Sequence, residues 1–455
     1  MARPRNIILI VADSLRYDSV YRRAHNKFKY PARLKYTRRN AIQFSQARSS
    51  GCWTLPATSS MFTGLMPHEH GATGQSRKLR ADIPVLPELL KQAGYRTYQV
   101  TANVATTGIF DLDRGFDQVF KIWNHIEPIF NNVYKFVLML GKPRIRKLLF
   151  SKDQVAYQLT QDMKIAQCWV QNTYQTIFKK TREILHANQE QGHGSFLFLN
   201  LMESHFPYHV DRTFQLSGND LREQISEMSG LYHMLNQSFL KSDREYINPK
   251  TMRILKHRQY RSWKLISRDV DDFLHELHED KDNLVIFCSD HGDNFGEHGW
   301  VYHFSNVTDA GNQVPVFWFG HDHPDPKIVN HPVSMRFLYN SILEACSLPH
   351  SGGTLFKEEA FTLPIMQSYW YNNQGKTLDK YKYNQFCFVE NEKRFLQRED
   401  DWYGAAVQRK AREPGFKQLR KNFDPILHFV EDTERRQYLS ESLRDFRSFS
   451  ESLTS

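Results

Sequence analysis

The sequence predicts an α/β protein with a large, mostly parallel central sheet flanked by helices. Three uninterrupted apolar runs, Asn6–Ala12, Ser195–Leu201 and Asn283–Cys288, are typical of interior strands that are buried on both faces. Helical patterns alternate with strand patterns, as where the helix expected at Leu86–Ala93 precedes the strand expected at Arg96–Thr101. Polar or ionisable residues follow each apolar run at once. We therefore expect these residues to meet at the carboxyl edge of the sheet, where open α/β sheets bind their ligands.

At roughly 150 residues per domain, a chain of 455 residues suggests about three domains, although large α/β enzymes often form one core with insertions. We expect residues 1–349 to form the core, with helical insertions at about 119–191 and 216–263. Residues 350–455 are more polar and contain short strand patterns, which predict a small C-terminal α+β subdomain and tail. The charged, serine-rich end at Glu431–Ser455 is expected to fray.

Composition restricts the partners and the compartment. The chain carries 60 lysines and arginines against 50 aspartates and glutamates, and the net charge of +10 favours anionic partners. The basic residues are dispersed without a recognition motif, so we predict no nucleic-acid partner. The apolar runs are shorter than the roughly 20 residues of a membrane span, and a strand rather than a secretory signal follows the N-terminus. The five scattered cysteines form no CxxC pair, which favours buried free thiols. These features predict a cytoplasmic location.

A basic, aromatic segment at Phe120–Phe150 leaves two interpretations open. One is a peripheral contact with the anionic inner face of a membrane, or with a lipid-linked substrate. The other, which we favour, is a helical pair that packs on the core.

Candidate metal ligands follow two of the apolar runs. Asp13 comes directly after the first run, and Asp290 and His291 come just after the third. Two carboxylates and an imidazole suit Zn²⁺ or Mn²⁺, with Ca²⁺ or Mg²⁺ as alternatives. The sequence predicts one divalent ion here and leaves a second ion unassigned.

A hydroxyl at the start of a helix is the candidate fourth ligand, because the first turn of a helix favours an incoming anion. Thr54 fits this position, since Pro56 is tolerated in a first turn and Gly64 is a typical helix stop. A simple helix cap is the alternative for Thr54. Ordinary loop positions are the alternative for the two aspartates and the histidine.

Five blocks of sequence carry a resemblance to a known family. They are NIILIVADSLRYD, TLPATSSMFTGLMPHEHGA, LPELLKQAGYRTYQVT, FLFLNLMESHFPYH and SDHGDNFGEHGWVYHF, in this order. Together they resemble the sulfatase and alkaline phosphatase superfamily over most of the chain. The resemblance implies an alkaline-phosphatase-like α/β fold with a small C-terminal domain, and one or two metal ions at the nucleophile.

The resemblance also decides between the nucleophile candidates. Typical sulfatases have Cys or Ser, any residue, Pro, Ser and Arg, and the first residue becomes formylglycine. Pro56 places Thr54 at that first position and leaves Cys52 out of register. Threonine cannot be oxidised to this aldehyde, so Thr54 is expected to attack directly, as in relatives that transfer phosphoethanolamine or glycerol phosphate and in nucleotide phosphodiesterases.

Other departures from the sulfatase pattern point the same way. Thr58 stands where an arginine is expected, and the expected Lys and His positions fall near Ala102 and Val104. Ser14 follows Asp13 where sulfatases have paired aspartates, and His291 stands where many have asparagine. The remaining set of Asp13, Thr54, Asp290 and His291 matches the phosphotransferase and phosphodiesterase branch.

Three further histidines match positions near the substrate in relatives. His205, His298 and His303 are expected to contact nonbridging oxygens or to donate a proton to the leaving group. The alternative for each is a loop histidine bonded to backbone. The pairs His68 with His70 and His321 with His323 are interpreted as structural.

The sequence thus predicts a metal-dependent phosphoester hydrolase or phospho-group transferase with a phospho-threonine intermediate. Its substrate is expected to be anionic, carrying phosphate or sulfate, on a glycan or a lipid. Two alternatives stay open: a sulfuric ester hydrolase without formylglycine, and a non-catalytic protein that binds a glycan or lipid on the same fold.

Overall fold

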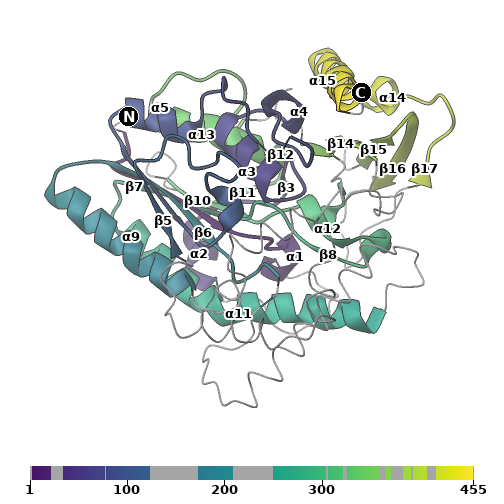
Figure 1. The fold of residues 1–455 in the computed structure, drawn as a ribbon. Coiled ribbons are helices and arrows are strands. Elements are labelled where there is room, and N and C mark those ends of the chain that lie inside the picture. The colour runs from purple at the N-terminus through teal and green to yellow at the C-terminus, as the bar shows by residue number, and fades with distance from the viewer. Residues whose placement is uncertain are drawn as a thin grey trace, which may run out of the picture.

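The central element is an eight-stranded sheet with the strand order β11-β2-β10-β7-β1-β6-β4-β5 (Figure 1). The computed structural model of the chain describes residues 3–21, 34–76, 78–122, 173–206, 208, 249–303, 306–320, 325–357, 364–369, 383–390, 393–406 and 417–453. The strands of the sheet are β1 (Asn6–Ala12), β2 (Ile42–Phe44), β4 (Arg96–Thr101), β5 (Gln118–Lys121), β6 (Ser195–Leu201), β7 (Asn283–Cys288), β10 (Val316–Phe319) and β11 (Ile328–Val329).

Five neighbouring strands, β7, β1, β6, β4 and β5, are parallel, and β10 is antiparallel to both of its neighbours. In β1, Asn6 pairs with Ser195 of β6 on one side and with Asn283 of β7 on the other. The three predicted interior strands are therefore adjacent, and every residue of each is buried. This confirms the predicted α/β fold with a mostly parallel sheet.

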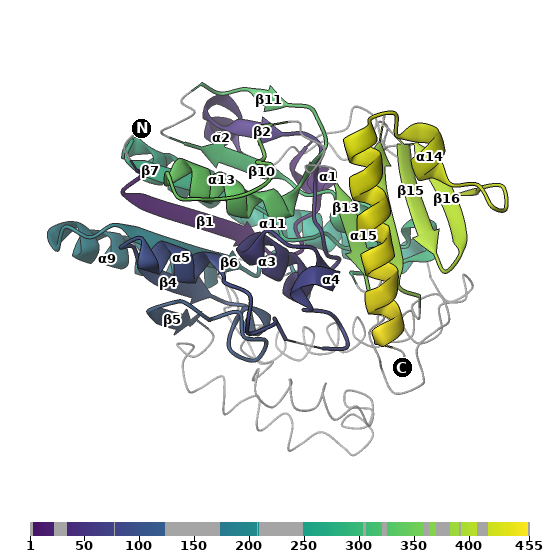
Figure 2. The same ribbon diagram turned by 90° about the horizontal axis from the view of Figure 1, so that it is seen from above.

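Helices cover both faces of the sheet (Figures 1 and 2). One face packs against α3 (Thr54–Thr63), α5 (Leu86–Gln92) and α13 (Leu338–Ala345), and the other against α9 (Thr173–Glu190) and α11 (Pro249–Glu279). Side chains of a strand alternate between the faces. Thus Leu9 of β1 joins the first core and Ile10 joins the second.

The segments predicted as insertions have a different role in the part that the structure describes. Residues 118–121 form strand β5, although the sequence pattern predicts helix from about residue 119. The helices α9 and α11 bury apolar stripes, which include Ile177 and Trp263, against the sheet. These two helices form the layer that covers this face of the sheet. Their outer surfaces are polar, which is why the sequence pattern predicts insertions there.

The remaining elements of the large core are short. They comprise the strand pairs β3 (Ala47–Arg48) with β12 (Val333–Ser334) and β8 (Asn294–Phe295) with β9 (Val301–Tyr302). The short helices are α1 (Tyr17–Val20), α2 (Lys35–Asn40), α4 (Pro67–His70) and α12 (Asp309–Asn312), and the 3₁₀ turns are η1 (Val104–Thr106), η4 (Glu297–Gly299) and η5 (Met335–Phe337).

A separate antiparallel sheet follows near the C-terminus (Figure 2). It consists of β13 (Ile365–Ser368), β14 (Gln385–Glu390), β15 (Lys393–Arg398), β16 (Asp401–Ala406) and β17 (Lys417–Gln418), with helices α14 (Pro425–Phe429) and α15 (Thr433–Ser452). The predicted fraying of the end is wrong for α15. Leu439, Leu443 and Phe446 lie on one face of this helix and are buried in the core of the sheet. The charged residues occupy the remaining faces and hide this short apolar stripe in the sequence.

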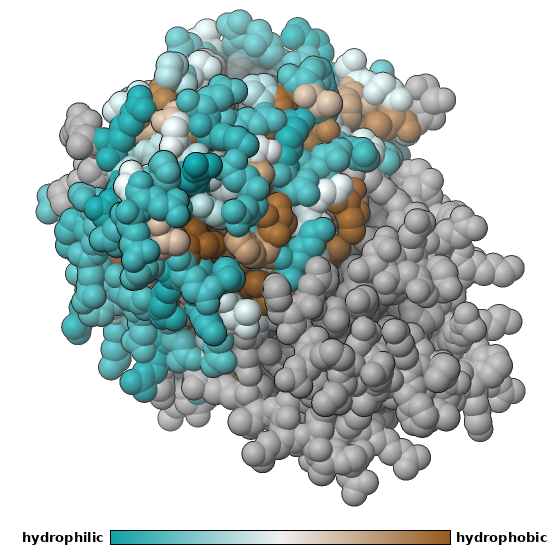
Figure 3. All heavy atoms as spheres, turned by 60° about the vertical axis from the view of Figure 1, so that its left-hand side comes forward, coloured by the Kyte–Doolittle hydropathy of each residue, from teal (hydrophilic) through white to brown (hydrophobic). Residues whose placement is uncertain are grey.

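On the face shown in Figure 3, the coloured residues are mostly hydrophilic, with apolar residues gathered in patches between them. Within the described ranges, no helix combines the length and the apolar character needed to cross a membrane. The basic segment that the sequence analysis singles out lies outside the described residues from residue 123 onward. Four of the five cysteines, Cys52, Cys288, Cys346 and Cys387, are described and are buried.

Candidate active site

The structure brings together the four residues that the sequence predicts as metal ligands. Asp13 follows β1, Asp290 and His291 follow β7 by one residue, and Thr54 is the first residue of α3. The Thr54 hydroxyl lies 3.3 Å from Oδ2 of Asp13 and 3.4 Å from Nε2 of His291. The same Nε2 lies 3.7 Å from Oδ1 of Asp13 and 3.4 Å from Oδ2 of Asp290. We call these four residues the candidate metal site.

Thr54 is held by the start of its helix. Trp53 is extended, with φ of −160°, and its carbonyl accepts the first helical hydrogen bond from the Ala57 N–H. Pro56 lies in the first turn, and Gly64 ends the helix in the left-handed region with φ of 74°. The hydroxyl of Thr54 contacts the side chains of Asp13 and His291. The N-cap residue of α3 is Trp53, so Thr54 is not the helix cap of the alternative interpretation.

The two carboxylates of the candidate metal site are buried against each other. Burial, followed by the negative charge of Asp13, raises the pKa of Asp290 well above its ordinary value. Burial alone would also raise the pKa of Asp13, but the nearby imidazoles of His205, His291 and His303 lower it below its ordinary value. Without a cation, the pair therefore resists carrying two negative charges.

The donor set at this point fits a divalent ion. Asp290 Oδ1 accepts from the backbone N–H groups of Ser14 and His291, at 3.2 and 2.9 Å. Its other oxygen, Oδ2, is buried and has no hydrogen-bond donor among the described residues. Asp13, Asp290 and His291 each offer a ligand atom, and these atoms lie within 4.8 Å of one another. An orphaned carboxylate oxygen beside a second carboxylate and an imidazole is the arrangement that a metal ion would complete.

Asn103 is a member of the site that the sequence analysis missed. Its amide nitrogen donates to Oδ2 of Asp13 at 2.6 Å and lies 3.4 Å from the Thr54 hydroxyl. Its oxygen accepts from the Ala105 N–H at 2.7 Å, which caps η1 and fixes the side chain. Asn103 follows β4, so the rule that polar residues after parallel strands meet at one edge would have found it.

A second buried cluster adjoins the candidate metal site and contains Asp293, which the sequence analysis also missed. His303, predicted as a substrate contact, donates from Nδ1 to Oδ1 of Asp293 at 2.6 Å. Its ring centroid lies 4.4 Å from that of His291 and 5.4 Å from that of His205. Burial raises the pKa of Asp293 to about 6 and lowers the pKa of His303 well below its ordinary value. The position of Asp293 two residues after His291 was the available signal.

His205 lies beside this second cluster with both ring nitrogens engaged. Its Nδ1 donates to the backbone carbonyl of Phe206 at 2.6 Å, and its Nε2 lies 3.1 Å from the Tyr302 hydroxyl. Since the carbonyl accepts only from a protonated nitrogen, Nε2 of the neutral ring accepts from Tyr302. Both interpretations of His205 therefore apply in part: it is bonded to backbone, and it stands next to the site.

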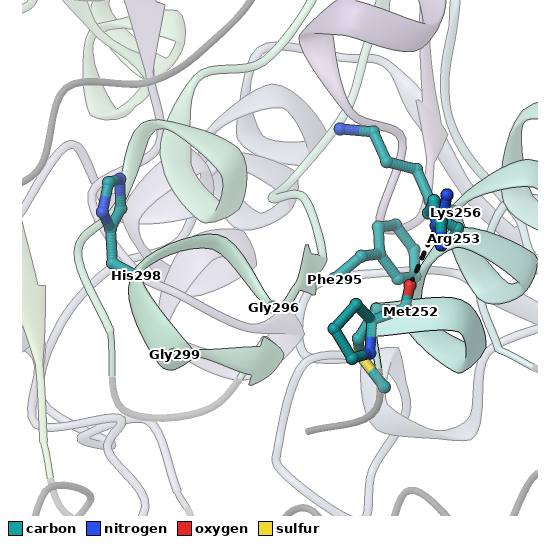
Figure 4. A pocket seen from close by; sticks show the side chains of 8 residues that line it. Met252, Arg253, Lys256, Phe295, Gly296, His298 and Gly299 are labelled. Carbon is teal, nitrogen blue, oxygen red and sulfur yellow. Dashed lines mark hydrogen bonds between the residues drawn. The ribbon is translucent and has the colours of Figure 1, made fainter. Parts of the chain in front are cut away.

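His298 takes a different position from the other predicted histidines. It is exposed, adopts the left-handed backbone conformation with φ of 52°, and lines a pocket of about 480 Å³ together with Met252, Arg253, Lys256 and Phe295. Figure 4 shows its ring turned away from the side chains of α11 on the opposite wall. The contacts that define the candidate metal site are made by other residues. The sequence match placed His298 by its distance along the chain, and the tight η4 turn directs it outward.

Of the two histidine pairs that the sequence interprets as structural, the first lies within the described residues. His70 is buried, where its Nδ1 accepts from the Ala72 N–H and its Nε2 donates to the Ser60 hydroxyl, both at 3.1 Å. His68 contacts Gln367 of β13. This is the structural role that the sequence predicts for the first pair, and His321 and His323 lie outside the described residues.

The mostly parallel eight-stranded sheet and the separate C-terminal sheet define the fold class as alkaline-phosphatase-like. Within this class, residues 5–348 match the family described as Sulfatase, and the chain belongs to the sulfatase family. The resemblance that the sequence blocks carry is thereby confirmed. No curated protein matches the chain in sequence.

Solved structures share the fold over nearly the whole chain. Phosphonate monoester hydrolase SpPMH from Silicibacter pomeroyi matches with a TM-score of 0.65 at 14% identity, covering 97% of this chain and 95% of that chain. Lipoteichoic acid synthase LtaP from Listeria monocytogenes has a TM-score of 0.57 at 12% identity, with coverages of 100% and 93%. A protein solved in complex with its substrate D-glucosamine-2-N,6-O-disulfate has a TM-score of 0.54 at 11% identity, with coverages of 98% and 98%. At these identities the likeness shows the fold, and the chemistry has to be argued from the site.

Proposed function

We propose that the protein is a metal-dependent phosphoester hydrolase or phospho-group transferase that works through a covalent phospho-threonine at Thr54. One observation carries the proposal. The Thr54 hydroxyl opens α3 and points at Asp13 and His291, at distances of 3.3 and 3.4 Å. A hydroxyl in this position can attack the substrate. It would have to attack directly, because threonine cannot form the aldehyde hydrate that typical sulfatases use.

Asp13, Thr54, Asp290 and His291 would hold one divalent ion, with Zn²⁺ or Mn²⁺ suiting the mixture of carboxylate, hydroxyl and imidazole ligands. When bound, such an ion polarises a phosphoryl oxygen and favours the ionised form of the Thr54 hydroxyl. Asn103 donates to Asp13 and so fixes the carboxylate that accepts from Thr54. These side chains come from β1, α3, β4 and β7, so the rigid sheet sets their geometry.

The reaction proceeds in two displacements. Thr54 Oγ attacks phosphorus in line, the Oγ–P bond forms, the bond from phosphorus to the substrate alcohol breaks, and that alcohol leaves with a proton. A hydroxyl of water or of an acceptor then attacks phosphorus, the Oγ–P bond breaks, and Thr54 regains its proton. The first turn of α3, which begins at Thr54, would face the anionic group with the favourable end of the helix dipole.

The net charge of the chain and the names of its structural neighbours support the proposed substrate class. The net charge of +10 favours a phosphate-bearing molecule. The names of the structural neighbours, a phosphonate monoester hydrolase, a lipoteichoic acid synthase and a protein bound to a sulfated glucosamine, support a glycan or lipid-linked substrate. A cytoplasmic location and a peripheral contact with the membrane stay predictions.

Thr54→Ala is the decisive variant, with Cys52→Ala as its matched control in the same loop. We expect Thr54→Ala to lower turnover of an aryl phosphodiester roughly ten-thousandfold and to abolish a covalent phospho adduct seen by intact mass. Cys52, which is buried two residues before Thr54, should be replaceable with most of the activity retained. The reversed pattern would refute the proposal.

Paired aryl phosphate, phosphodiester, phosphonate and sulfate substrates separate the alternatives. Membership of the sulfatase family keeps sulfuric ester hydrolysis as the second candidate. Preferred turnover of the sulfate would support that candidate. Absence of turnover with all four, combined with tight binding of a glycan or lipid, would support a non-catalytic binding protein.

A further inference from the structure

The carboxylate of Asp293 is fully buried beside the candidate metal site, but it belongs to a separate set of contacts. Its Oδ1 accepts from Nδ1 of His303 at 2.6 Å. Its Oδ2 accepts from the Tyr208 hydroxyl at 2.6 Å and from the Gln259 amide at 3.3 Å. We call Tyr208, Gln259, Asp293 and His303 the Asp293 cluster.

Three different segments hold this carboxylate. Gln259 lies on α11 and also donates to the backbone carbonyls of Ser14 and Ser204, at 2.8 and 3.0 Å. It therefore ties the Asp293 cluster to the loops that follow β1 and β6. Tyr208 is buried and adopts the left-handed backbone conformation with φ of 54°, which is uncommon for an aromatic residue. Asp293 is consequently fixed from both oxygens and has little freedom to turn.

We propose that Asp293 is a positioning residue that holds His303 as the Nδ1–H tautomer and directs Nε2 of His303, as a hydrogen-bond acceptor, toward the hydroxyl that attacks the phospho-threonine. The inference rests on the proposed function for the identity of that hydroxyl. With Asp293 ionised, the tautomer follows from the 2.6 Å contact, because a carboxylate only accepts and the nitrogen beside it must donate. With Nδ1 protonated, the neutral ring carries its lone pair on Nε2, on the opposite side of the ring.

The ring is in the right neighbourhood for this role. His303 lies 4.4 Å from His291 between ring centroids and is buried. The ring of Tyr302 stacks on it with centroids 3.8 Å apart, which fixes the plane of the imidazole. A carboxylate that fixes both tautomer and plane is the arrangement by which outer residues support a reacting imidazole.

The alternative for the same atoms is a second metal ion, since His291, Asp293 and His303 also offer ligand atoms within 4.8 Å of one another. The hydrogen bonds argue against it. Both oxygens of Asp293 already have donors, and Nδ1 of His303 is used by the carboxylate itself. An ion would have to displace these donors rather than complete an unsatisfied set.

The first test is the tautomer of His303 in the full chain, measured by long-range ¹H–¹⁵N spectra of ¹⁵N-histidine protein with and without Zn²⁺. The spectrum of His303→Gln assigns the signals. We expect a protonated Nδ1 and an unprotonated Nε2 in the wild type, and loss of this single tautomer in Asp293→Asn, because the amide can donate to Nδ1 as well as accept. An unchanged His303 signature in Asp293→Asn would overturn the proposal.

The second test separates positioning from mere stability by its kinetic pattern. With an aryl phosphodiester, Asp293→Asn should lower kcat roughly 10- to 100-fold, with little change in KM. The fraction of protein carrying the Thr54 adduct should rise, because the attack on the adduct is the slowed step. Tyr208→Phe should keep the tautomer and cost much less activity, since Gln259 still donates to Asp293.

Glu203→Gln is the matched control, a buried acid two residues after β6 whose Oε1 accepts from the Tyr174 N–H and the Thr173 hydroxyl. It should leave both the His303 signature and the adduct fraction unchanged. Loss of one bound metal ion per chain in Asp293→Asn would favour the second-ion alternative and overturn the proposal. If the wild type forms no adduct, the proposed function fails, whereas the tautomer still decides whether Asp293 holds His303.

Discussion

Two acid–histidine clusters lie side by side at the carboxyl edge of the sheet, and both meet the distances expected of a metal site. In the candidate metal site, Asp13 and Asp290 face each other, and Oδ2 of Asp290 has no hydrogen-bond donor among the described residues. In the Asp293 cluster, both carboxylate oxygens have donors. A short distance between possible ligand atoms therefore does not by itself define a metal site. The state of their hydrogen bonds decides whether a cation is needed.

The largest expected difference between variants of the two clusters is in metal affinity. Asp13→Asn and Asp290→Asn each remove a charged ligand, and we expect the affinity for Mn²⁺ or Zn²⁺ to fall roughly a thousandfold, or about 4 kcal/mol. Asp293 contacts none of these ligands, so Asp293→Asn should change the metal affinity by less than about tenfold. Chelator competition and metal analysis of the purified proteins measure both effects. Equal losses in all three variants would make the two clusters a single metal centre.

Gly292 lies between the two clusters, and a side chain there should disturb both. A Cβ atom at this position would lie 2.2 Å from the backbone carbonyl oxygen of Ala310, and the Gly292 N–H already donates to the Gly311 carbonyl at 2.7 Å. Gly292→Ala therefore forces the loop apart, and we expect the free energy of unfolding to fall by about 3 kcal/mol. Metal affinity should fall with it, because His291 is the preceding residue.

Gly94→Ala is the control for the Gly292 variant. No atom lies within 4 Å of its added Cβ, but its φ is +95°. This variant should be destabilised by about 1 to 2 kcal/mol through backbone strain alone, with metal binding intact. Denaturant unfolding and metal analysis of the two variants separate the effects. A Gly292→Ala protein with wild-type metal affinity would show that the close approach does not position His291.

The same comparison shows what could be predicted from the sequence. Apolar runs with polar residues after them identified β1, β6 and β7, and placed Asp13, Asp290 and His291 at one edge. Applied to the strand that ends at Thr101, the rule would also have found Asn103. The Asp293 cluster needed coordinates, because the glutamine that anchors it looks like any polar residue on an amphipathic helix, 245 positions from Ser14 in sequence.

The departures have physical causes too. His298 was placed by its sequence block, but the backbone turn of η4 directs it outward, at the edge of a separate pocket. The helix α15 was hidden because a stripe of a few buried residues holds it, while charge dominates its composition. Segment composition predicts average exposure, whereas folding depends on one face of the helix.

The smallest expected effect is a pH dependence of stability at a buried histidine outside the candidate metal site and the Asp293 cluster. His70 resembles the Asp293 cluster, since both of its ring nitrogens have partners in the neutral form. Burial, followed by the charge of His68, lowers the pKa of His70 to about 3. In the unfolded chain its pKa is about 6.5, so between these values the unfolded state binds more protons than the folded state. The stability that the neutral ring contributes is therefore complete above about pH 6.5 and is lost as the pH falls toward 3.

Between about pH 8 and about pH 5, His70 should cost the folded protein about 2 kcal/mol, which is roughly 1.5 pH units at 1.36 kcal/mol each. His70→Gln keeps a donor for Ser60 but does not titrate in this range. Urea unfolding of both proteins across this window gives the difference in stability, in which the contributions of the other histidines cancel. The variant should gain on the wild type as the pH falls. A constant difference would mean that His70 has the same pKa in the folded protein as in the unfolded chain, and that its contact with the Ala72 N–H does not hold the neutral ring.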